Sequence, residues 1–238
     1  MTYGYIHSIV SPGTVDGPGV RAVAFFQGCP LRCAYCHNPD TWRAGGGEKV
    51  TARELVKRVL RFRSYFGARG GVTASGGEPL LQAEFVAEFF RLLKKESIHT
   101  ALDTSGCQGD GGIDINVNTP VPLTLKHTDL VILDIKHTGP TQYNKLTGGD
   151  LQNTLDFLES ARGAGCQILI RQVIIPGIND TPEQVLNLKK IADGIKIELK
   201  PYHTLGISKW QKLGIDYLLK AVPPCSEEKI RELREIVK

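Results

Sequence analysis

Eleven residues near the start of the chain carry its strongest signal: Gly28-Cys29-Pro30-Leu31-Arg32-Cys33-Ala34-Tyr35-Cys36-His37-Asn38. The cysteines follow the spacing C-x3-C-x2-C, which places three thiols on one short loop. Thiolates are the usual protein ligands of iron–sulfur clusters, which normally take four of them. Three thiolates would hold a cubane cluster by three irons and leave the fourth iron open to bind and reduce a small molecule.

A structural zinc site is the alternative that this spacing leaves open, with His37 or a distant residue as fourth ligand. His37 directly follows Cys36, so the two side chains can reach one ion only with difficulty. Zinc sites usually contain two C-x2-C-like pairs, and this sequence has no second pair. The remaining cysteines are widely separated and match no ligand pattern, so we interpret them as ordinary cysteines: Cys107, Cys166 and Cys225.

The composition is that of a chain that can form a folded core. Its 238 residues are 41% hydrophobic and 23% charged, so we expect a single domain over 1–238. The net charge is only +4 and the charges are scattered, which disfavours nucleic-acid binding. No uncharged apolar run approaches a membrane span, and no secretory signal pattern is visible. We therefore expect a cytoplasmic protein that binds neither nucleic acid nor membrane.

Strand-like and helix-like segments alternate along the chain. Apolar runs predict strands over residues 20–26, 71–74, 98–102, 130–134, 166–175 and 195–199. Helices are predicted over 51–66, 82–95, 151–162 and 181–192, with a last helix beginning after Ser226. Six strands alternating with helices predict an α/β fold with a parallel sheet and right-handed crossovers. Residues 109–127 are predicted to be irregular, because Asn and Pro residues interrupt the helix expected there.

Residues able to do chemistry follow the carboxyl ends of the predicted strands, where ligands bind in parallel α/β folds. The cysteine loop follows the first strand, and a Gly76-Gly77-Glu78 turn follows the second. Asp103-Thr104 follows the third strand, and Asp134-Ile135-Lys136 closes the fourth. Arg171 and His203 lie toward or after the ends of the last two. This coincidence predicts one site at that edge of the sheet.

Several of these residues also have an ordinary structural interpretation. A Gly-Gly turn is often just a tight loop between a strand and a helix. Asp103 and Thr104 offer hard oxygens to a cation such as sodium, potassium or magnesium, but they can equally cap the next turn. A histidine after a strand, such as His203, is more often a structural hydrogen-bonding group.

Longer motifs around these residues resemble a known family. The C-x3-C-x2-C spacing with an aromatic residue before the last cysteine is the signature of the radical S-adenosylmethionine (SAM) enzymes. Taken in order, the motifs resemble those of the pyruvate formate-lyase activating enzymes, from about residue 7 to about residue 210. The matching stretches are residues 14–21 (TVDGPGVR), 25–29 (FFQGC), 36–42 (CHNPDTW), 72–78 (VTASGGE), 134–136 (DIK) and 200–203 (KPYH).

The resemblance implies a radical SAM core, which is a partial (β/α)6 TIM-like barrel with one open side. It implies that a [4Fe–4S] cluster binds to Cys29, Cys33 and Cys36. The SAM-binding residues that it implies are Tyr35, Cys36, His37, Gly77, Asp134, Ile135, Lys136 and His203. It also implies a monovalent cation, sodium or potassium, at Asp103, Thr104 and Asp134. Asp16 and Arg171 are expected to lie beside the loop of the protein substrate.

The activity that the resemblance implies is the removal of one hydrogen atom. The reduced cluster cleaves SAM to methionine and a 5′-deoxyadenosyl radical, which takes a hydrogen atom from a glycine of pyruvate formate-lyase. The resulting glycyl radical activates that enzyme for anaerobic metabolism. A flavodoxin or ferredoxin is expected to donate the electron, and the activase is expected to be a monomer.

Two other functions remain open at this point. The chain could activate a different glycyl radical enzyme, such as a dehydratase or an anaerobic ribonucleotide reductase. Many activases of that wider group carry an inserted domain with eight extra cysteines, which is lacking between Cys36 and Thr51. A non-catalytic binding module stabilised by zinc is the alternative from another functional class.

Overall fold

The computed structural model describes residues 2–107 and 120–238, and the strands of this part form one sheet. The strands are β1 (Tyr3–Gly13), β2 (Arg21–Phe26), β3 (Glu48–Thr51), β4 (Gly71–Gly76), β5 (His99–Thr104), β6 (Leu130–Asp134), β7 (Gln167–Ile174) and β8 (Lys196–Pro201). Strand β2 and strands β4 to β8 are parallel. The predicted parallel α/β core is therefore confirmed. An antiparallel edge formed by β1 and β3 was missed.

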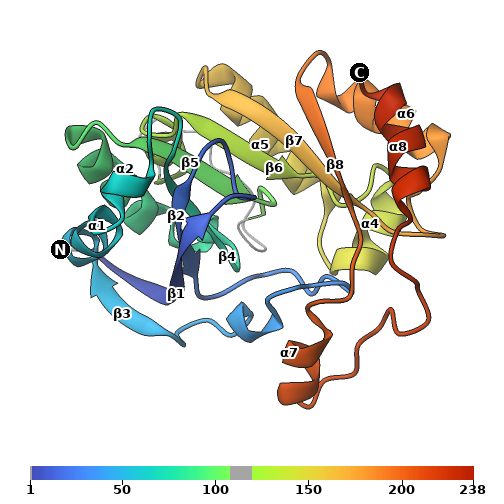
Figure 1. Cartoon of the computed structure of the whole chain (residues 1–238), viewed down its shortest axis with the longest axis horizontal. Helices are drawn as coiled ribbons and strands as arrows, with labels where there is room; N and C mark the ends of the chain where they lie inside the picture. The colour runs from blue at the N-terminus through green and yellow to red at the C-terminus, as the bar shows by residue number, and fades with distance from the viewer. Residues whose placement is uncertain (1, 108–119) are drawn as a thin grey trace.

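The sheet curls without closing into a full barrel. Its strand order is β3-β1-β2-β4-β5-β6-β7-β8, so β3 and β8 are its two edges in the described part of the chain. Figure 1 shows the segment that follows β2 crossing the open side toward β8. The open partial barrel that the resemblance implied is the fold observed.

Helices cover the outer face of the sheet. The longer ones are α1 (Ala52–Leu60), α2 (Ala83–Lys95), α5 (Leu151–Gly163), α6 (Pro182–Ala192) and α8 (Glu227–Ile236). The shorter ones are α3 (Pro120–Leu125), α4 (Pro140–Thr147) and α7 (Ile207–Lys212), with 3-10 turns η1 (Pro39–Thr41), η2 (Arg63–Tyr65) and η3 (Pro79–Gln82). Figure 1 shows α1 and α2 at one end of the curved sheet and α6 and α8 at the other. None of the helices in the described residues has the length and apolarity needed to cross a membrane.

Local sequence signals explain where several helices begin. Thr51 and Glu54 form the predicted capping box, in which each side chain bonds the backbone N–H of the other residue. Thr181 caps α6 with Pro182 at its first position, and Ser226 caps α8. These caps satisfy N–H groups that have no partner within the helix. The sequence therefore predicts where these helices begin better than where they end.

The predicted helix over 51–66 is wrong at its end, because α1 stops at Leu60. The chain continues as η2 and then passes through Gly67, whose φ of 56° favours glycine. The irregular crossover predicted over 109–127 lies mostly outside the described residues, and its described remainder contains the short helix α3. Helices α4 and α7 were not predicted.

A buried arginine joins the first turn of the chain to the sheet. The Arg21 side chain is fully buried and donates to Thr73 Oγ1 at 2.6 Å, Val72 O at 2.8 Å and Pro18 O at 3.1 Å. Thr73 Oγ1 in turn donates to the backbone oxygen of Asp16 at 2.8 Å. Burial lowers the pKa of Arg21 to about 10. These bonds hold the turn that carries Asp16 at the side of the sheet.

Candidate active site

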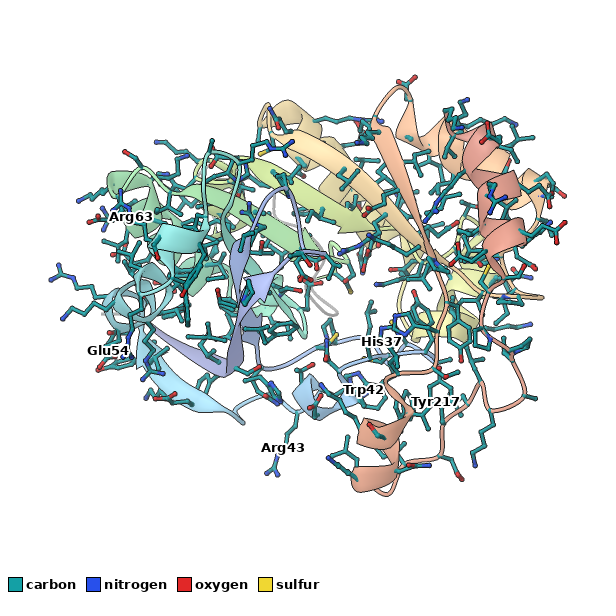
Figure 2. All side chains as sticks on the ribbon, in the orientation of Figure 1. His37, Trp42, Arg43, Glu54, Arg63 and Tyr217 are labelled. Atoms are coloured by element: carbon teal, nitrogen blue, oxygen red, sulfur yellow. The ribbon has the colours of Figure 1, made fainter. Side chains whose placement is uncertain are left out.

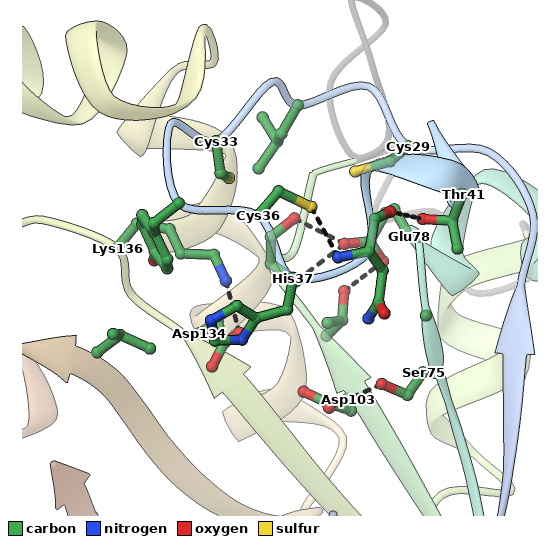
Figure 3. A pocket seen from close by; sticks show the side chains of 18 of the residues that line it. Cys29, Cys33, Cys36, His37, Thr41, Ser75, Glu78, Asp103, Asp134 and Lys136 are labelled. Atoms are coloured by element: carbon green, nitrogen blue, oxygen red, sulfur yellow. Dashed lines mark hydrogen bonds and ion pairs between the residues drawn. The ribbon is translucent and has the colours of Figure 1, made fainter. Parts of the chain in front are cut away.

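A cavity of about 380 Å³ lies at the carboxyl ends of the parallel strands. Its volume falls within the range of small-molecule sites. Figure 3 shows the thiols of the cysteine loop at one end of the cavity and Asp103 and Ser75 at the other. The residues predicted for the site that line it are Asp16, Cys29, Cys33, Tyr35, Cys36, His37, Gly77, Asp103, Thr104, Asp134, Lys136, Arg171 and His203.

Ile135 is the predicted site residue that does not line this cavity. Its side chain is fully buried. Its backbone N–H donates to Arg171 O at 3.0 Å, and its backbone oxygen accepts from Gln172 Nε2 at 2.9 Å. Ile135 therefore ties the end of β6 to β7 and places its neighbours Asp134 and Lys136 at the cavity wall.

The three cysteines of the loop are free thiols with little exposure to water. Cys33 is buried, and Cys29 and Cys36 are half-buried. Burial raises the pKa of all three, that of Cys33 to about 12. A raised pKa keeps these thiols protonated at neutral pH, whereas a metal centre binds thiolates. Binding of a metal centre at this loop would therefore release protons.

The turn after β4 touches the first residues of the cysteine loop. Gly77 N–H donates to Phe26 O at 2.9 Å, and Glu78 N–H donates to Gly28 O at 2.7 Å. A Cβ on Gly77 would lie 2.1 Å from Gly28 O, which is far inside van der Waals contact. Only glycine fits at this position, and the close packing fixes the loop against the turn.

A chain of alternating charges forms one wall of the cavity. The Arg171 guanidinium bridges Asp103 and Asp134, with Nε 2.8 Å from Asp134 Oδ1. Lys136 Nζ lies 2.5 Å from the other oxygen of Asp134, and Ser75 donates to Asp103 at 2.9 Å. Burial alone would raise the pKa of Asp134, but Arg171 and Lys136 lower it to about 2. Asp134 is therefore ionised at neutral pH.

Two histidines that line the cavity stack on each other beside the cysteine loop. The His37 and His203 rings are 4.3 Å apart and nearly parallel, and His37 Nε2 lies 3.2 Å from His203 O. Burial lowers the pKa of His37, which favours the neutral ring. The segment after β8 is thus in direct contact with the cysteine loop.

Comparison with known proteins identifies the family. Residues 23–188 match the model of the radical SAM superfamily. The pyruvate formate-lyase-activating enzyme of Clostridium pasteurianum is 48% identical, over 100% of this chain and 98% of its own length. The pyruvate formate-lyase 1-activating enzyme of Escherichia coli K12 is 42% identical, over 98% of this chain and 95% of its own. This chain belongs to the family of pyruvate formate-lyase-activating enzymes. The resemblance seen in the motifs is confirmed.

Solved structures agree on the fold of this family member. A domain of a pyruvate-formate lyase-activating enzyme from Bacteroides vulgatus superposes with a TM-score of 0.54 at 22% sequence identity. The match covers 70% of this chain and 92% of the Bacteroides chain. Streptococcus suis SuiB bound to its precursor peptide superposes with a TM-score of 0.64 at 14% sequence identity. The match covers 88% of this chain and 43% of the SuiB chain. At these identities the likeness concerns the fold alone.

The donor set of this radical SAM chain fits the [4Fe–4S] cluster and SAM that the family uses. Cys29, Cys33 and Cys36 offer three thiols to separate irons of one cubane. In the described part of the chain, no three His, Cys, Asp or Glu side chains are grouped to hold a single metal ion. The zinc-stabilised binding module is disfavoured instead by the family, whose curated members are enzymes.

Glu78 organises the site, and the sequence analysis did not assign it. Its buried carboxylate accepts from Thr104 Oγ1 at 2.5 Å, Ser105 Oγ at 2.6 Å, Ser105 N–H at 2.8 Å and Leu80 N–H at 3.0 Å. Burial raises the pKa of Glu78, while these donors act in the opposite direction. Glu78 thereby joins the turn after β4 to the loop after β5. The only sequence signal was its place in the Gly-Gly-Glu turn.

Two further charged groups face this cavity in the radical SAM chain. Burial and the Asp103 carboxylate raise the pKa of Asp16 to about 6, although Arg171 and Lys200 act against this. Lys200 also lines the cavity and was not predicted as a site residue. Acidic and basic side chains thus lie together around a space open to a polar ligand.

Proposed function

We propose that this chain removes a hydrogen atom from a glycine of pyruvate formate-lyase. One observation carries the proposal: three thiols, one buried and two half-buried, share a single cavity of about 380 Å³ with a wall in which Arg171 pairs with Asp103 and Asp134. A chain of this family needs both, because the thiols hold the cluster and the wall orients the amino acid cofactor. When bound, the cluster and SAM supply the electron and the 5′-deoxyadenosyl radical that takes the hydrogen atom.

We infer that SAM contacts residues from four loops of the cavity. Gly77 allows close backbone approach, and Lys136 can donate to the ribose or the carboxylate. The Tyr35 hydroxyl is buried with no hydrogen-bond partner in the described residues, so a polar ligand atom there would relieve an unsatisfied group. His37 and His203 would cover SAM beside the cysteine loop and exclude water there. Because Ile135 is covered by β7, we assign it no contact with SAM through its N–H.

A monovalent cation near the SAM carboxylate would have to compete with Arg171. The guanidinium already bridges Asp103 and Asp134, and the Thr104 hydroxyl is bonded to Glu78. We propose that sodium or potassium binds between the two aspartates when Arg171 turns away. The released guanidinium would then face the mouth of the cavity, where the glycine loop of the protein substrate enters.

Asp16 is proposed to contact that glycine loop together with Arg171. Both line the cavity, and the bonds of Arg21 and Thr73 fix the turn that carries Asp16. A carboxyl and a guanidinium at one mouth can bind the N–H and C=O groups of an extended peptide. This pairing would orient one backbone Cα toward the interior.

We propose a monomer with one domain over 1–238, supported by the single sheet, and a flavodoxin or ferredoxin as electron donor. We place its work in the cytoplasm, where thiols stay reduced, because Cys29, Cys33 and Cys36 are free thiols that a metal centre needs.

The proposal is tested by anaerobic incubation with reductant, SAM and pyruvate formate-lyase, followed by electron paramagnetic resonance (EPR). We expect a glycine-centred doublet with the wild-type chain and none with Cys33→Ala. Absence of the doublet with a folded, iron-loaded wild-type chain would contradict the choice of substrate. A doublet on another glycyl radical enzyme would then support the alternative activase.

A further inference from the structure

Helix α7 (Ile207–Lys212) contacts the cysteine loop from the far end of the chain. Lys209 Nζ donates to Asn38 Oδ1 at 2.8 Å and lies 3.1 Å from Asp40 Oδ2. Trp210 Nε1 donates to the backbone oxygen of Cys36 at 2.8 Å. Figure 1 shows α7 beside the segment that crosses the open side of the sheet. Two neighbouring side chains therefore hold the loop at Cys36 and Asn38 and the following turn η1 at Asp40.

The Trp210 ring is itself fixed by packing. It is 2% exposed and makes edge contacts with Trp42 at 5.0 Å and Tyr217 at 5.2 Å between ring centroids. Figure 2 shows the labelled His37, Trp42 and Tyr217 gathered on this side of the molecule. The Tyr217 hydroxyl is hydrogen-bonded to that of Tyr202 at 2.7 Å. The indole N–H is thus presented to the cysteine loop by a rigid group of rings.

These contacts converge on the sulfur of Cys36. The backbone N–H of Asn38 donates to Cys36 Sγ at 3.4 Å. Lys209 holds the Asn38 side chain and Trp210 holds the Cys36 carbonyl, so α7 fixes both ends of this N–H···S hydrogen bond. Hydrogen bonds to ligand sulfurs and nearby net charge set the reduction potentials of iron–sulfur clusters.

We propose that Lys209 and Trp210 are positioning residues that raise the reduction potential of the cluster. The inference rests on the proposed function, in which Cys36 is a cluster ligand. A hydrogen bond to the sulfur and a positive charge nearby both stabilise the reduced cluster, which carries one more negative charge. Asp40 faces Lys209 and also lies 3.2 Å from His7 Nε2, so removal of Lys209 leaves a less compensated carboxylate beside the loop.

The test compares three variants of the iron-loaded full chain. Trp210→Phe keeps an aromatic ring but removes the N–H donor, and Lys209→Met removes the ammonium. Lys212→Met is the matched control, because Lys212 lies on the same helix and has no hydrogen bond or ion pair to the cysteine loop in the described residues. Iron content and thermal unfolding establish that each variant is loaded and folded. The midpoint potential is then measured by a redox titration read by EPR.

We expect Trp210→Phe and Lys209→Met to shift the midpoint to more negative values, with Lys212→Met unchanged. If each change weakens one hydrogen bond, the reduction equilibrium falls about threefold to tenfold, which is about 30 to 60 mV for one electron. Asn38→Ala, which removes the acceptor of Lys209 without removing a charge, should shift the midpoint in the same direction. It serves as the second variant if Trp210→Phe fails to fold.

Loaded variants whose midpoints equal that of the wild type would overturn the inference. So would an equal shift in Lys212→Met, because that would mean a general charge effect of the helix. A wild-type chain that takes up no iron would instead contradict the proposed function, and the inference with it. The two failures are therefore distinguishable in the same experiment.

Discussion

Replacing Glu78 with Gln tests the hydrogen-bonded centre of the site. Each carboxylate oxygen accepts from a backbone N–H, Oε1 from Leu80 and Oε2 from Ser105. A glutamine amide must place its NH2 group at one of these oxygens, whichever way it is turned. One buried N–H would then face another, and the charge-assisted character of the remaining bonds would be lost.

The expected cost of Glu78→Gln is about 2 to 3 kcal/mol, the penalty for one unsatisfied buried donor and weaker bonds to the rest. For a domain of this size that lowers the melting temperature by about 5 to 10 °C. Thermal unfolding at neutral pH measures it. Glu84→Gln is the control, because Glu84 is exposed near the start of α2 and should change little.

An unchanged melting temperature in Glu78→Gln would refute this reasoning. It would mean that Glu78 is already protonated in the native protein, so that the amide reproduces its hydrogen bonds. Burial acts in that direction by raising the pKa. We expect Glu78 to stay ionised at neutral pH, because each of its oxygens already faces a backbone N–H, which cannot accept a proton.

Three further changes probe other parts of the site. Asp16→Asn should stabilise the fold by about 3 kcal/mol at pH 7.5 and by little at pH 4. The pKa of Asp16 is about 6 in the folded chain and about 3.9 in the unfolded chain, so the wild type loses stability as the pH rises from about 4 to about 6. Urea unfolding at pH 4 and pH 7.5 measures the difference, and a gain that does not depend on pH would contradict it. Arg171→Gln should cost about 3 to 5 kcal/mol by leaving Asp103 and Asp134 unbridged, and added potassium should restore part of the loss if a cation binds there, as followed by melting temperature. Gly206→Ala places a Cβ 2.9 Å from His37 Cα, so iron retained after gel filtration should fall, whereas Gly163→Ala, with open space around its Cβ, should retain it.

Strands β2 and β6 could be predicted because they are buried on both faces along most of their length and read as nearly continuous apolar runs. The run over 130–134 matches β6 at both ends, and the caps at Thr51, Thr181 and Ser226 are short-range signals. Strand β1 was missed because its sequence YGYIHSIVSPG mixes glycine and polar residues and its burial pattern is irregular. Its place in the sheet depends on pairing with β2 and β3.

The sequence predicted which loops form the site, but not the hydrogen bonds that join these loops. Strand order brings the loops together, so the residues expected at the strand ends line one cavity, whereas Asp16 and Tyr35 were placed there by the resemblance and Lys200 was missed. The role of Glu78 depends on where Thr104 and Ser105 meet it, 26 and 27 residues further along the chain. The contact of α7 with the cysteine loop spans more than 160 residues, and a six-residue helix has too short a periodic pattern to be recognised.

The origin of the hydrogen atom tests the central claim most directly. Pyruvate formate-lyase labelled with α-deuterated glycine is incubated anaerobically with this chain, reductant and SAM, and the 5′-deoxyadenosine formed is analysed by mass spectrometry. We predict 5′-deoxyadenosine that carries one deuterium, together with a glycine-centred radical on the partner. 5′-Deoxyadenosine formed without deuterium would contradict the claim that this cavity brings a glycine Cα of that partner to SAM.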